Sequence, residues 1–310
     1  MWDLDLTNMN SSNCYDSMIS ILLKRFGFEE ALLYLNSFSS KHFTVDKDGI
    51  GHIIRGIYSS DILNNLFHMS TEAFDLSSIT DLEELISKEL AFCPVGVWCD
   101  PYDCHWSPLF GKQHYSHLLL IIDIDNNNKS YVCVDVYYQS TGNIILSFDA
   151  MKSLCKEIFV FKFPGEICDY TMEAWDYLKN YIKVPDKSEY KEENENMIEY
   201  ILSLSPDTIG NPANIETSIL LINLMWISED KRNFLKALQY LDNRAGKPFF
   251  ESVYPLLEEA SKEVALLKNI LMKYAITHNQ NADKIKRSIN EFYRLNREIA
   301  EEMHIILLKR

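Results

Sequence analysis

The segments with strand-like composition all lie in the first half of this chain, and this asymmetry limits the possible folds more than any other feature of the sequence. Runs of apolar, β-branched and aromatic residues that are typical of strands occur at 94–98, 117–124, 131–138 and 158–163. After residue 170 we find no convincing strand. Apolar residues at helical spacing cover that part of the chain instead, at about 171–182, 188–204, 215–227, 229–243, 248–277 and 282–308. The pattern predicts an α+β first half followed by an all-helical second half.

The sequence FPGE, residues 163–166, marks the change between these two patterns. Proline and glycine interrupt regular structure there, so we expect one domain at 1–165 and a helical domain at 166–310. Within the first domain, DNNN at 125–128 is a polar turn that would join two strands as an antiparallel hairpin. TDLE at 80–83 is a capping box, which predicts that a helix begins there.

Charge and composition argue against several classes of partner. The chain has 310 residues and a formal net charge of −15, and residues 1–165 carry 11 Lys and Arg against 21 Asp and Glu. Such a surface repels phosphate backbones and anionic lipid headgroups, so we expect neither nucleic-acid nor membrane binding. The first residues lack the basic and apolar regions of a signal peptide, and no apolar run is long enough to cross a bilayer. Seven irregularly spaced cysteines favour reduced thiols, and we expect a cytoplasmic protein.

The stretch SSNCYDSMIS, residues 11–20, places a cysteine where a helix is expected to begin. Asn13 is a good N-cap residue, which would make Cys14 the first residue of a helix over 14–25. The helix dipole and the unpaired N–H groups at that position would stabilise a thiolate and a developing oxyanion. Free cysteines are more often small buried apolar residues, so packing is the alternative interpretation of Cys14.

His117 and Asp135 would supply the base and the orienting carboxylate that a cysteine nucleophile needs. With the hairpin centred on Asn126, the two residues lie directly opposite each other on neighbouring strands. A carboxylate in that position orients the imidazole and fixes its tautomer. An acidic residue within VCVDV also requires a partner if it is buried. The alternative is that Asp135 lies on a solvent face and His117 has no role, and His114 is a rival for the base.

Three segments together resemble a known group of enzymes: NCYDSMISILLKRFGF, GVWCDPYDCHWSPLFGKQHYSHLLLIID and YVCVDVYY. They are similar to papain-like cysteine enzymes, and more narrowly to the cysteine-protease-like acyltransferases of thiotemplated, nonribosomal antibiotic biosynthesis. The butirosin-pathway acyltransferase family is the group that residues 10–140 resemble, and the amidotransferase of closthioamide assembly is a related possibility. The resemblance implies a papain-like fold, with an N-terminal helix and an antiparallel sheet, and the helical second half is compatible with it.

The chemistry of that family is the transfer of an acyl or peptidyl group from the phosphopantetheine arm of a carrier protein to an amine, through a cysteinyl thioester. The resemblance implies that Cys14 is the nucleophile, His117 the base and Asp135 the residue that orients the base. Papain-like enzymes often have an oxyanion donor several residues before the cysteine, where Asn8 has the expected offset and Asn10 is its rival. No cofactor bound to the enzyme itself is implied. Two other functions stay open: a peptidase or thioesterase that uses the same triad with water, and a non-enzymatic interaction module.

The loop DPYDCHWSP, residues 100–108, is an aromatic, turn-rich segment that leads towards the predicted base. Within it we name Tyr102, Asp103 and Trp106 as candidate substrate-binding residues, together with His114 after it; packing within the turn is the alternative for these residues. Several cysteines and histidines lie nearby, but they form no C-x-x-C pair and match no common zinc spacing, so we expect no metal site.

The last helical stretch carries four basic residues on one broad face: Lys284, Arg287, Arg294 and Arg297. Carrier proteins are typically acidic, so this face is a candidate docking surface for one. The alternative is a solvated helix face whose charges are balanced by neighbouring acidic residues.

Overall fold

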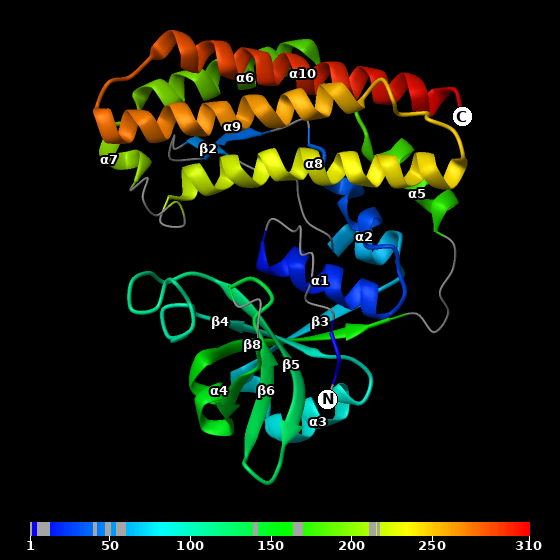
Figure 1. Ribbon diagram of the computed structural model, residues 1–310, viewed down its shortest axis with the longest axis vertical. Coiled ribbons are helices and arrows are strands. Elements are labelled where there is room, and N and C mark those ends of the chain that lie inside the picture. The colour runs from blue at the N-terminus through cyan, green and yellow to red at the C-terminus, as the bar shows by residue number, and fades with distance from the viewer. Residues whose placement is uncertain are drawn as a thin grey trace. The chain divides into compact units, whose positions relative to one another are not determined.

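The computed structural model describes residues 2–4, 13–39, 42–46, 51–53, 60–138, 142–163, 170–210, 215 and 218–310. It is an α+β structure with an antiparallel sheet and a helical C-terminal region, as the sequence predicted (Figure 1). The chain divides into two compact units: unit 1 comprises residues 1–30 and 60–168, and unit 2 comprises residues 31–59 and 169–310. The predicted boundary near residue 165 therefore lies close to one of the observed ones, whereas residues 31–59 group with the helical unit.

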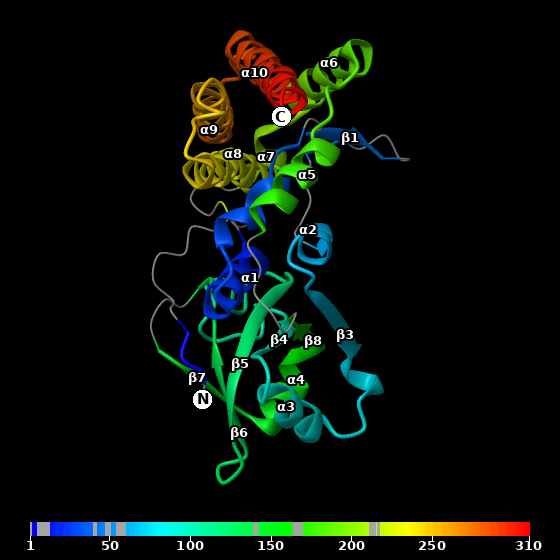
Figure 2. The same ribbon diagram turned by 90° about the vertical axis from the view of Figure 1, so that its right-hand side faces the viewer.

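Unit 1 is built on a six-stranded antiparallel sheet with the strand order β3-β8-β4-β5-β6-β7 (Figure 2). The strands are β3 (Ser70–Asp75), β4 (Val95–Cys99), β5 (His117–Asp125), β6 (Ser130–Val134), β7 (Ile144–Ser147) and β8 (Cys155–Lys162). Four of them correspond to the predicted strands, and β3 and β7 are additional. β3 lies at the edge of the sheet with no buried residue, so its sequence lacks the apolar alternation that identifies a strand.

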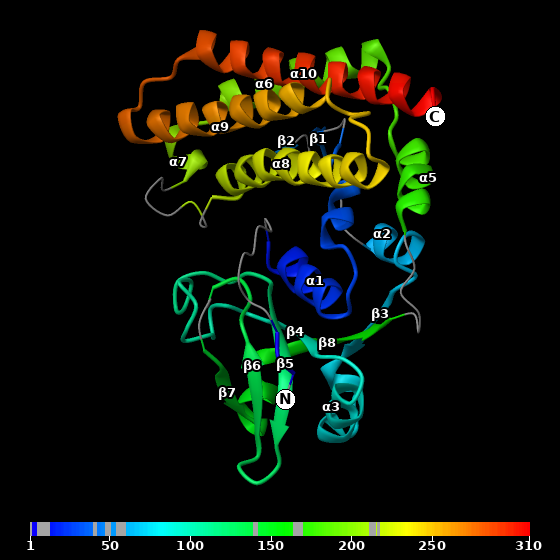
Figure 3. The same ribbon diagram turned by 45° about the vertical axis from the view of Figure 1, so that its right-hand side comes forward.

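Helices cover both faces of this sheet. They are α1 (Cys14–Arg25), α2 (Ser60–Asn65), the short 3₁₀ helix η2 (Leu76–Ser78), α3 (Leu82–Leu90) and α4 (Phe148–Leu154). Buried residues of α3 and α4 share a core with Val95 and Val97 of β4. Successive side chains of a strand point to opposite faces, so Gly96, between Val95 and Val97, faces the other side of the sheet. A Cβ at Gly96 would lie 3.3 Å from the sulfur of Met18, and α1 therefore lies on that side (Figure 3).

The local sequence fixes where α1 begins and ends. The side chain of Asn13 accepts a hydrogen bond from the Asp16 N–H at 2.8 Å, which confirms Asn13 as the N-cap and Cys14 as the first helical residue. Gly27, with φ of 79°, takes the left-handed conformation that ends the helix. α1 contacts β5, and its buried face contains four apolar residues identified from the sequence: Met18, Ile19, Leu22 and Leu23. The packing of α1 therefore determines where Cys14 lies relative to the sheet. In α3 the cap is Asp81, one residue after the start of the predicted capping box.

The pairing of β5 with β6 differs from the predicted hairpin. Leu120 pairs with Val134, a register that would place residue 137, and not Asp135, directly opposite His117. β6 also ends at Val134, so Asp135 lies in the turn after the strand and not within it. His117 and Asp135 are consequently diagonal neighbours, a separation that their side chains bridge.

Unit 2 consists of helices and one small hairpin. Its elements are most of the 3₁₀ helix η1 (Glu30–Asn36), β1 (Phe43–Val45), β2 (Gly51–Ile53), α5 (Thr171–Tyr181), α6 (Lys187–Ser203), α7 (Pro206–Ile209), α8 (Ile219–Ala245), α9 (Tyr254–Thr277) and α10 (Ala282–Leu308). The long helices α8, α9 and α10 lie side by side (Figures 1 and 3). Beyond residue 170 the described residues contain no strand, as predicted. None of the helices in the described ranges combines the length and the apolar composition that a membrane crossing requires.

Two helix predictions in unit 2 were wrong. The helices expected at 215–227 and 229–243 form the single helix α8, because no proline or glycine separates them and Ser228 is buried in a hydrogen bond with Ser261. The helix expected from residue 248 begins instead at Tyr254.

Polar contacts attach Ser39, His42 and Phe43 to the helices of unit 2. Glu193 of α6 accepts hydrogen bonds from the backbone N–H groups of His42, at 2.7 Å, and Phe43, at 3.0 Å. Lys231 of α8 places its Nζ 3.2 Å from Nε2 of His42 and 3.3 Å from the carbonyl oxygen of Ser39. Lys231 is completely buried, and burial lowers its pKa to about 7.

Candidate active site

The first residue of β5 and the residue that follows β6 form a buried pair. Nε2 of His117 lies 2.7 Å from Oδ2 of Asp135, and the two side chains are 2% and 0% exposed. Nε2 donates in this hydrogen bond, because a carboxylate only accepts. The contact thus fixes which ring nitrogen carries a proton towards Asp135.

Asp135 accepts hydrogen bonds at both of its carboxylate oxygens. Oδ1 accepts from the backbone N–H groups of Tyr137 and Tyr138, each at 2.9 Å. Oδ2 accepts from the indole Nε1 of Trp106 at 2.8 Å, in addition to His117. Burial raises the pKa of the Asp135 carboxyl, but the hydrogen bonds from His117 and the two backbone groups outweigh it and hold the pKa below its ordinary value. Asp135 is therefore a charged, buried carboxylate whose direction is set by four donors.

Cys14 is the second partner of His117. Interaction with Cys14 raises the pKa of the imidazole, and because Nε2 donates to Asp135, Nδ1 is the ring nitrogen left for another partner. Cys14 is half-buried at the first position of α1, where the leading N–H groups of a helix have no acceptor within the helix. The structure thus brings a thiol, an imidazole and a carboxylate together in the order nucleophile, base and orienting residue.

The acidic neighbours of His117 favour its charged form. Burial lowers the pKa of the imidazole, but the hydrogen bond to Asp135, the interaction with Cys14 and the negative charge of Asp135 outweigh burial and raise the pKa to about 10. At neutral pH His117 accordingly holds a proton.

Two other residues named from the sequence, Tyr102 and His114, form a separate cluster around Asp100, the residue after β4. His114 Nδ1 lies 2.9 Å from Asp100 Oδ2, the Tyr102 N–H donates to Oδ1 at 3.0 Å, and the Tyr102 and His114 rings stack with centroids 4.1 Å apart. Burial raises the pKa of the Asp100 carboxyl, but these hydrogen bonds outweigh it and hold the pKa below its ordinary value. His114 pairs with Asp100, whereas His117 pairs with Asp135. Asp103 is exposed in the turn that follows Asp100.

The remaining predicted residues have different outcomes. Trp106, expected on the rim of a substrate pocket, is half-buried and donates to Asp135. Asn8 and Asn10, the candidates for an oxyanion donor, lie outside the described residues. On α10, Arg294 is paired with Glu291 and Glu298, which favours a balanced helix face over a free basic surface there.

Sequence reasoning missed the contribution of the residues that follow Asp135. Besides donating its N–H, Tyr138 places its ring against that of His117, with centroids 4.5 Å apart. The tyrosine pair after VCVD was the available signal, because aromatic residues directly after a buried carboxylate lie within reach of its partner. Asp100 was also missed, and its signal was an acidic residue directly after a buried strand.

The other cysteines differ from Cys14 in their surroundings. All of those in the described residues are free thiols, and five are buried: Cys93, Cys99, Cys104, Cys133 and Cys155. Burial raises the thiol pKa of Cys93, Cys133 and Cys155, and a hydrogen bond with Cys104, followed by burial, raises that of Cys99. Within the described ranges no group of three or more acidic, cysteine and histidine side chains has the arrangement of a metal site.

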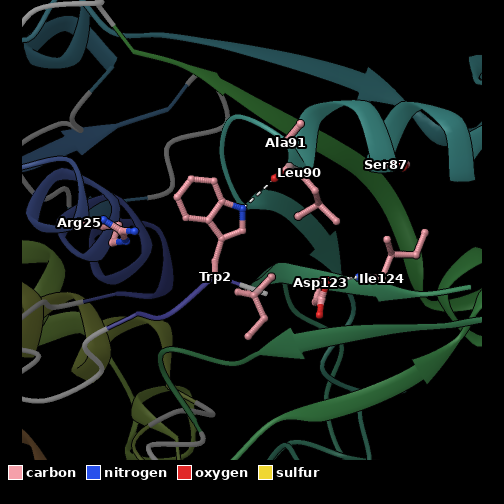
Figure 4. Close-up of a pocket in the computed structure, with 8 residues that line it drawn as sticks. Trp2, Arg25, Ser87, Leu90, Ala91, Asp123 and Ile124 are labelled. Atoms are coloured by element: carbon pink, nitrogen blue, oxygen red, sulfur yellow. Dashed lines mark hydrogen bonds between the residues drawn. The ribbon is translucent and has the colours of Figure 1, made fainter.

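A pocket of about 450 Å³ lies at the other end of α1 (Figure 4). Trp2, Arg25 and Asp123 line it, and the Trp2 indole donates to the carbonyl oxygen of Leu90 at 2.9 Å. Arg25 and Cys14 are the last and first residues of α1, which separates them by about 16 Å along the helix axis. This pocket is therefore distinct from the group around His117.

No protein-family model and no curated protein sequence matches this chain.

Proposed function

We propose that this protein is a cysteine acyltransferase with a papain-like unit 1, which moves an acyl or peptidyl group from a carrier protein to an amine and forms an amide. The observation that carries the proposal is the position of His117, which hydrogen-bonds the buried carboxylate of Asp135 and whose pKa is raised by interaction with both Asp135 and Cys14. A helix that begins at Cys14, packed on an antiparallel sheet that supplies the histidine from β5 and the aspartate from the turn after β6, also supports a papain-like assignment.

In the first half of the reaction, the Cys14 thiolate attacks the carbonyl carbon of the carrier-bound thioester. The tetrahedral intermediate collapses with release of the phosphopantetheine thiol, which takes the proton held by His117. The N–H of Cys14 at the start of α1, and one of the asparagines before it, are the proposed donors to the oxyanion.

In the second half, the amine attacks the thioester on Cys14. His117 accepts the proton that the amine loses, the C–S bond breaks and the amide leaves. Asp135 holds the imidazole in place through both halves and stays ionised. The phosphopantetheine group belongs to the carrier protein, so the enzyme needs no cofactor of its own. We place the reaction in the cytoplasm, where the thiols stay reduced.

The test uses a carrier protein loaded with an acyl-phosphopantetheine thioester and a panel of small amines, with products identified by mass spectrometry. We expect an amide product, and no product from Cys14→Ala or His117→Gln. His114→Gln is the matched control, since this exposed histidine pairs with Asp100 and should keep most of the activity. Formation of free acid alone in the presence of every amine would favour a thioesterase or peptidase. No turnover of any thioester, with Cys14 inert, would favour an interaction module.

A further inference from the structure

The ring of Tyr138 lies against the imidazole of His117. Their centroids are 4.5 Å apart and their planes are tilted by 31°. The backbone N–H of the same residue donates to Oδ1 of Asp135 at 2.9 Å. One residue in the turn after β6 therefore contacts both the orienting carboxylate and the imidazole that it orients.

The preceding residue takes a more distant place in the same turn. The Tyr137 ring centroid lies 6.2 Å from that of His117 and 5.0 Å from that of Tyr138, to which it is nearly perpendicular. Tyr137 also donates its N–H to Oδ1 of Asp135. The two tyrosines thus share the backbone role, while only Tyr138 lies directly on the imidazole.

Hydrogen bonds alone leave one motion of the imidazole open. The hydrogen bond from Nε2 to Asp135 fixes one end of the ring, but a single contact of this kind only weakly resists tilting of the ring plane. A ring packed on the face of the imidazole opposes that tilt. The face of an aromatic ring also carries partial negative charge and attracts a cation.

We propose that Tyr138 is a positioning residue, which holds the His117 imidazolium in the plane that points Nδ1 at Cys14 and stabilises its positive charge. The inference rests on the proposed function in one respect, that Cys14 and His117 act as a nucleophile–base pair. The groups that face His117 are the carboxylate of Asp135, the thiol of Cys14, the rings of Tyr137 and Tyr138, and the Cys99 sulfur, which lies 3.6 Å from the His117 carbonyl oxygen. Of these, Tyr138 is the one that lies on the face of the ring at 4.5 Å.

Two variants of Tyr138 test this proposal, with two readouts that need no acyl donor. The first readout is the rate of Cys14 alkylation by iodoacetamide against pH, and the second is the titration of the His117 ring by NMR. In Tyr138→Leu we expect the pKa of His117 to fall by about 0.5 to 1.5 and the onset of Cys14 alkylation to move to higher pH, the shift that a cation–π contact of ordinary strength would produce. Tyr138→Phe keeps the ring and should restore both profiles. Tyr137→Leu is the matched control and should shift them less.

Unchanged profiles in Tyr138→Leu would overturn the proposal, as would a Tyr138→Phe variant that behaves like Tyr138→Leu. If Tyr138→Leu fails to fold, the wild-type protein still tests the contact. Rings this close should give nuclear Overhauser effects between the ring protons of Tyr138 and His117. Their absence would refute the inference. If Tyr138→Leu shifts both profiles as expected but the wild-type protein transfers no acyl group, the proposed function is refuted and this inference stands.

Discussion

The indole N–H of Trp106 donates to the carboxylate of Asp135, with 2.8 Å between Nε1 and Oδ2. The same oxygen accepts the hydrogen bond from His117. The loop that follows β4 therefore supports the orienting residue at the same oxygen that His117 of β5 contacts. Loss of this hydrogen bond should change the orientation of the His117 imidazole and, through it, the reactivity of the Cys14 thiol.

Trp106→Phe should lower the rate of acyl transfer by about tenfold, because it removes one hydrogen bond to a charged group while the bulk of the ring stays. The change should appear mainly in kcat, since Trp106 acts through Asp135. Steady-state kinetics with a carrier-bound donor would measure it. An effect confined to KM would instead indicate that Trp106 contacts the substrate, as the sequence first suggested.

Asp135→Asn should lower the rate by about 10²–10⁴, by analogy with other triads. Four N–H groups point at Asp135, and an amide oxygen replaces only one of its two acceptor oxygens. The amide NH₂ must then face two donors. If it faces His117, the ring proton must move to Nδ1; if it faces the backbone, the N–H groups of Tyr137 and Tyr138 lose their acceptor. Single-turnover kinetics, with thermal unfolding as a control for folding, would measure the loss; near wild-type turnover would remove Asp135 from the mechanism.

Cys14 should be the first thiol to react when the folded protein is treated with limiting iodoacetamide at neutral pH. It is half-buried beside a charged imidazole, whereas Cys93, Cys133 and Cys155 are buried thiols whose pKa is raised by burial. Peptide mapping by mass spectrometry would rank the sites. His117→Gln should slow the alkylation of Cys14 and leave the other rates unchanged. Faster labelling of a buried cysteine would contradict the assignment of the nucleophile.

His117 should make the stability of the protein depend on pH in a known direction. Its pKa is about 10 in the folded protein and about 6.5 in an unfolded chain, so the folded state binds the proton more tightly. The resulting stabilisation is complete below about pH 6.5 and is lost as the pH rises through about 10. The free energy of unfolding of wild type relative to His117→Gln should therefore fall by at least about 1.4 kcal/mol between pH 6 and pH 10.5, as urea unfolding would show. A constant difference would mean that His117 is not held in its charged form.

Lys231 should have the opposite effect. Burial lowers its pKa to about 7, the neighbouring Asp230 opposes this in part, and an unfolded lysine titrates near 10.4. The folded state therefore binds fewer protons than the unfolded state between these values, and stability rises with pH across that window. Lys231→Met should remove the dependence, so its stability relative to wild type should be greater at pH 7 than at pH 10. Equal differences at both pH values in urea unfolding would show that the lysine is solvated.

The elements with strong, regular patterns were predictable from the sequence. The amphipathic spacing of 282–308 gave the observed bounds of α10, and the long apolar run from His117 gave β5 to within one residue. The edge strand β3 was not predictable, because it is largely exposed and pairs with the distant strand β8. β1 and β2 were not predictable either, because each has only three residues and they pair with each other.

The candidate site shows the same division between local and tertiary information. Asn13 and Cys14 at the start of α1 follow from local capping chemistry, which a sequence displays directly. The contact between His117 and Asp135 was expected from a register that is incorrect, since Asp135 reaches the imidazole from a turn and not from an opposed strand position. The supports at Trp106 and Tyr138 depend on where a loop and a turn lie in space, and a single sequence does not contain that information.

Because residues 31–59 belong to unit 2, the chain leaves unit 1 and returns to it before unit 2 is complete, and this order matters while the protein is being made. His42 emerges from the ribosome 151 residues before its partner Glu193 and 189 residues before Lys231. At ordinary synthesis rates these intervals amount to about 8 to 40 seconds. During that time all the strands of unit 1, which end at Lys162, emerge and can pair, whereas the helices of unit 2 after this segment begin only at Thr171. The helical unit can therefore close only late in translation, and His42 waits longer for its partners than β3 waits for β8.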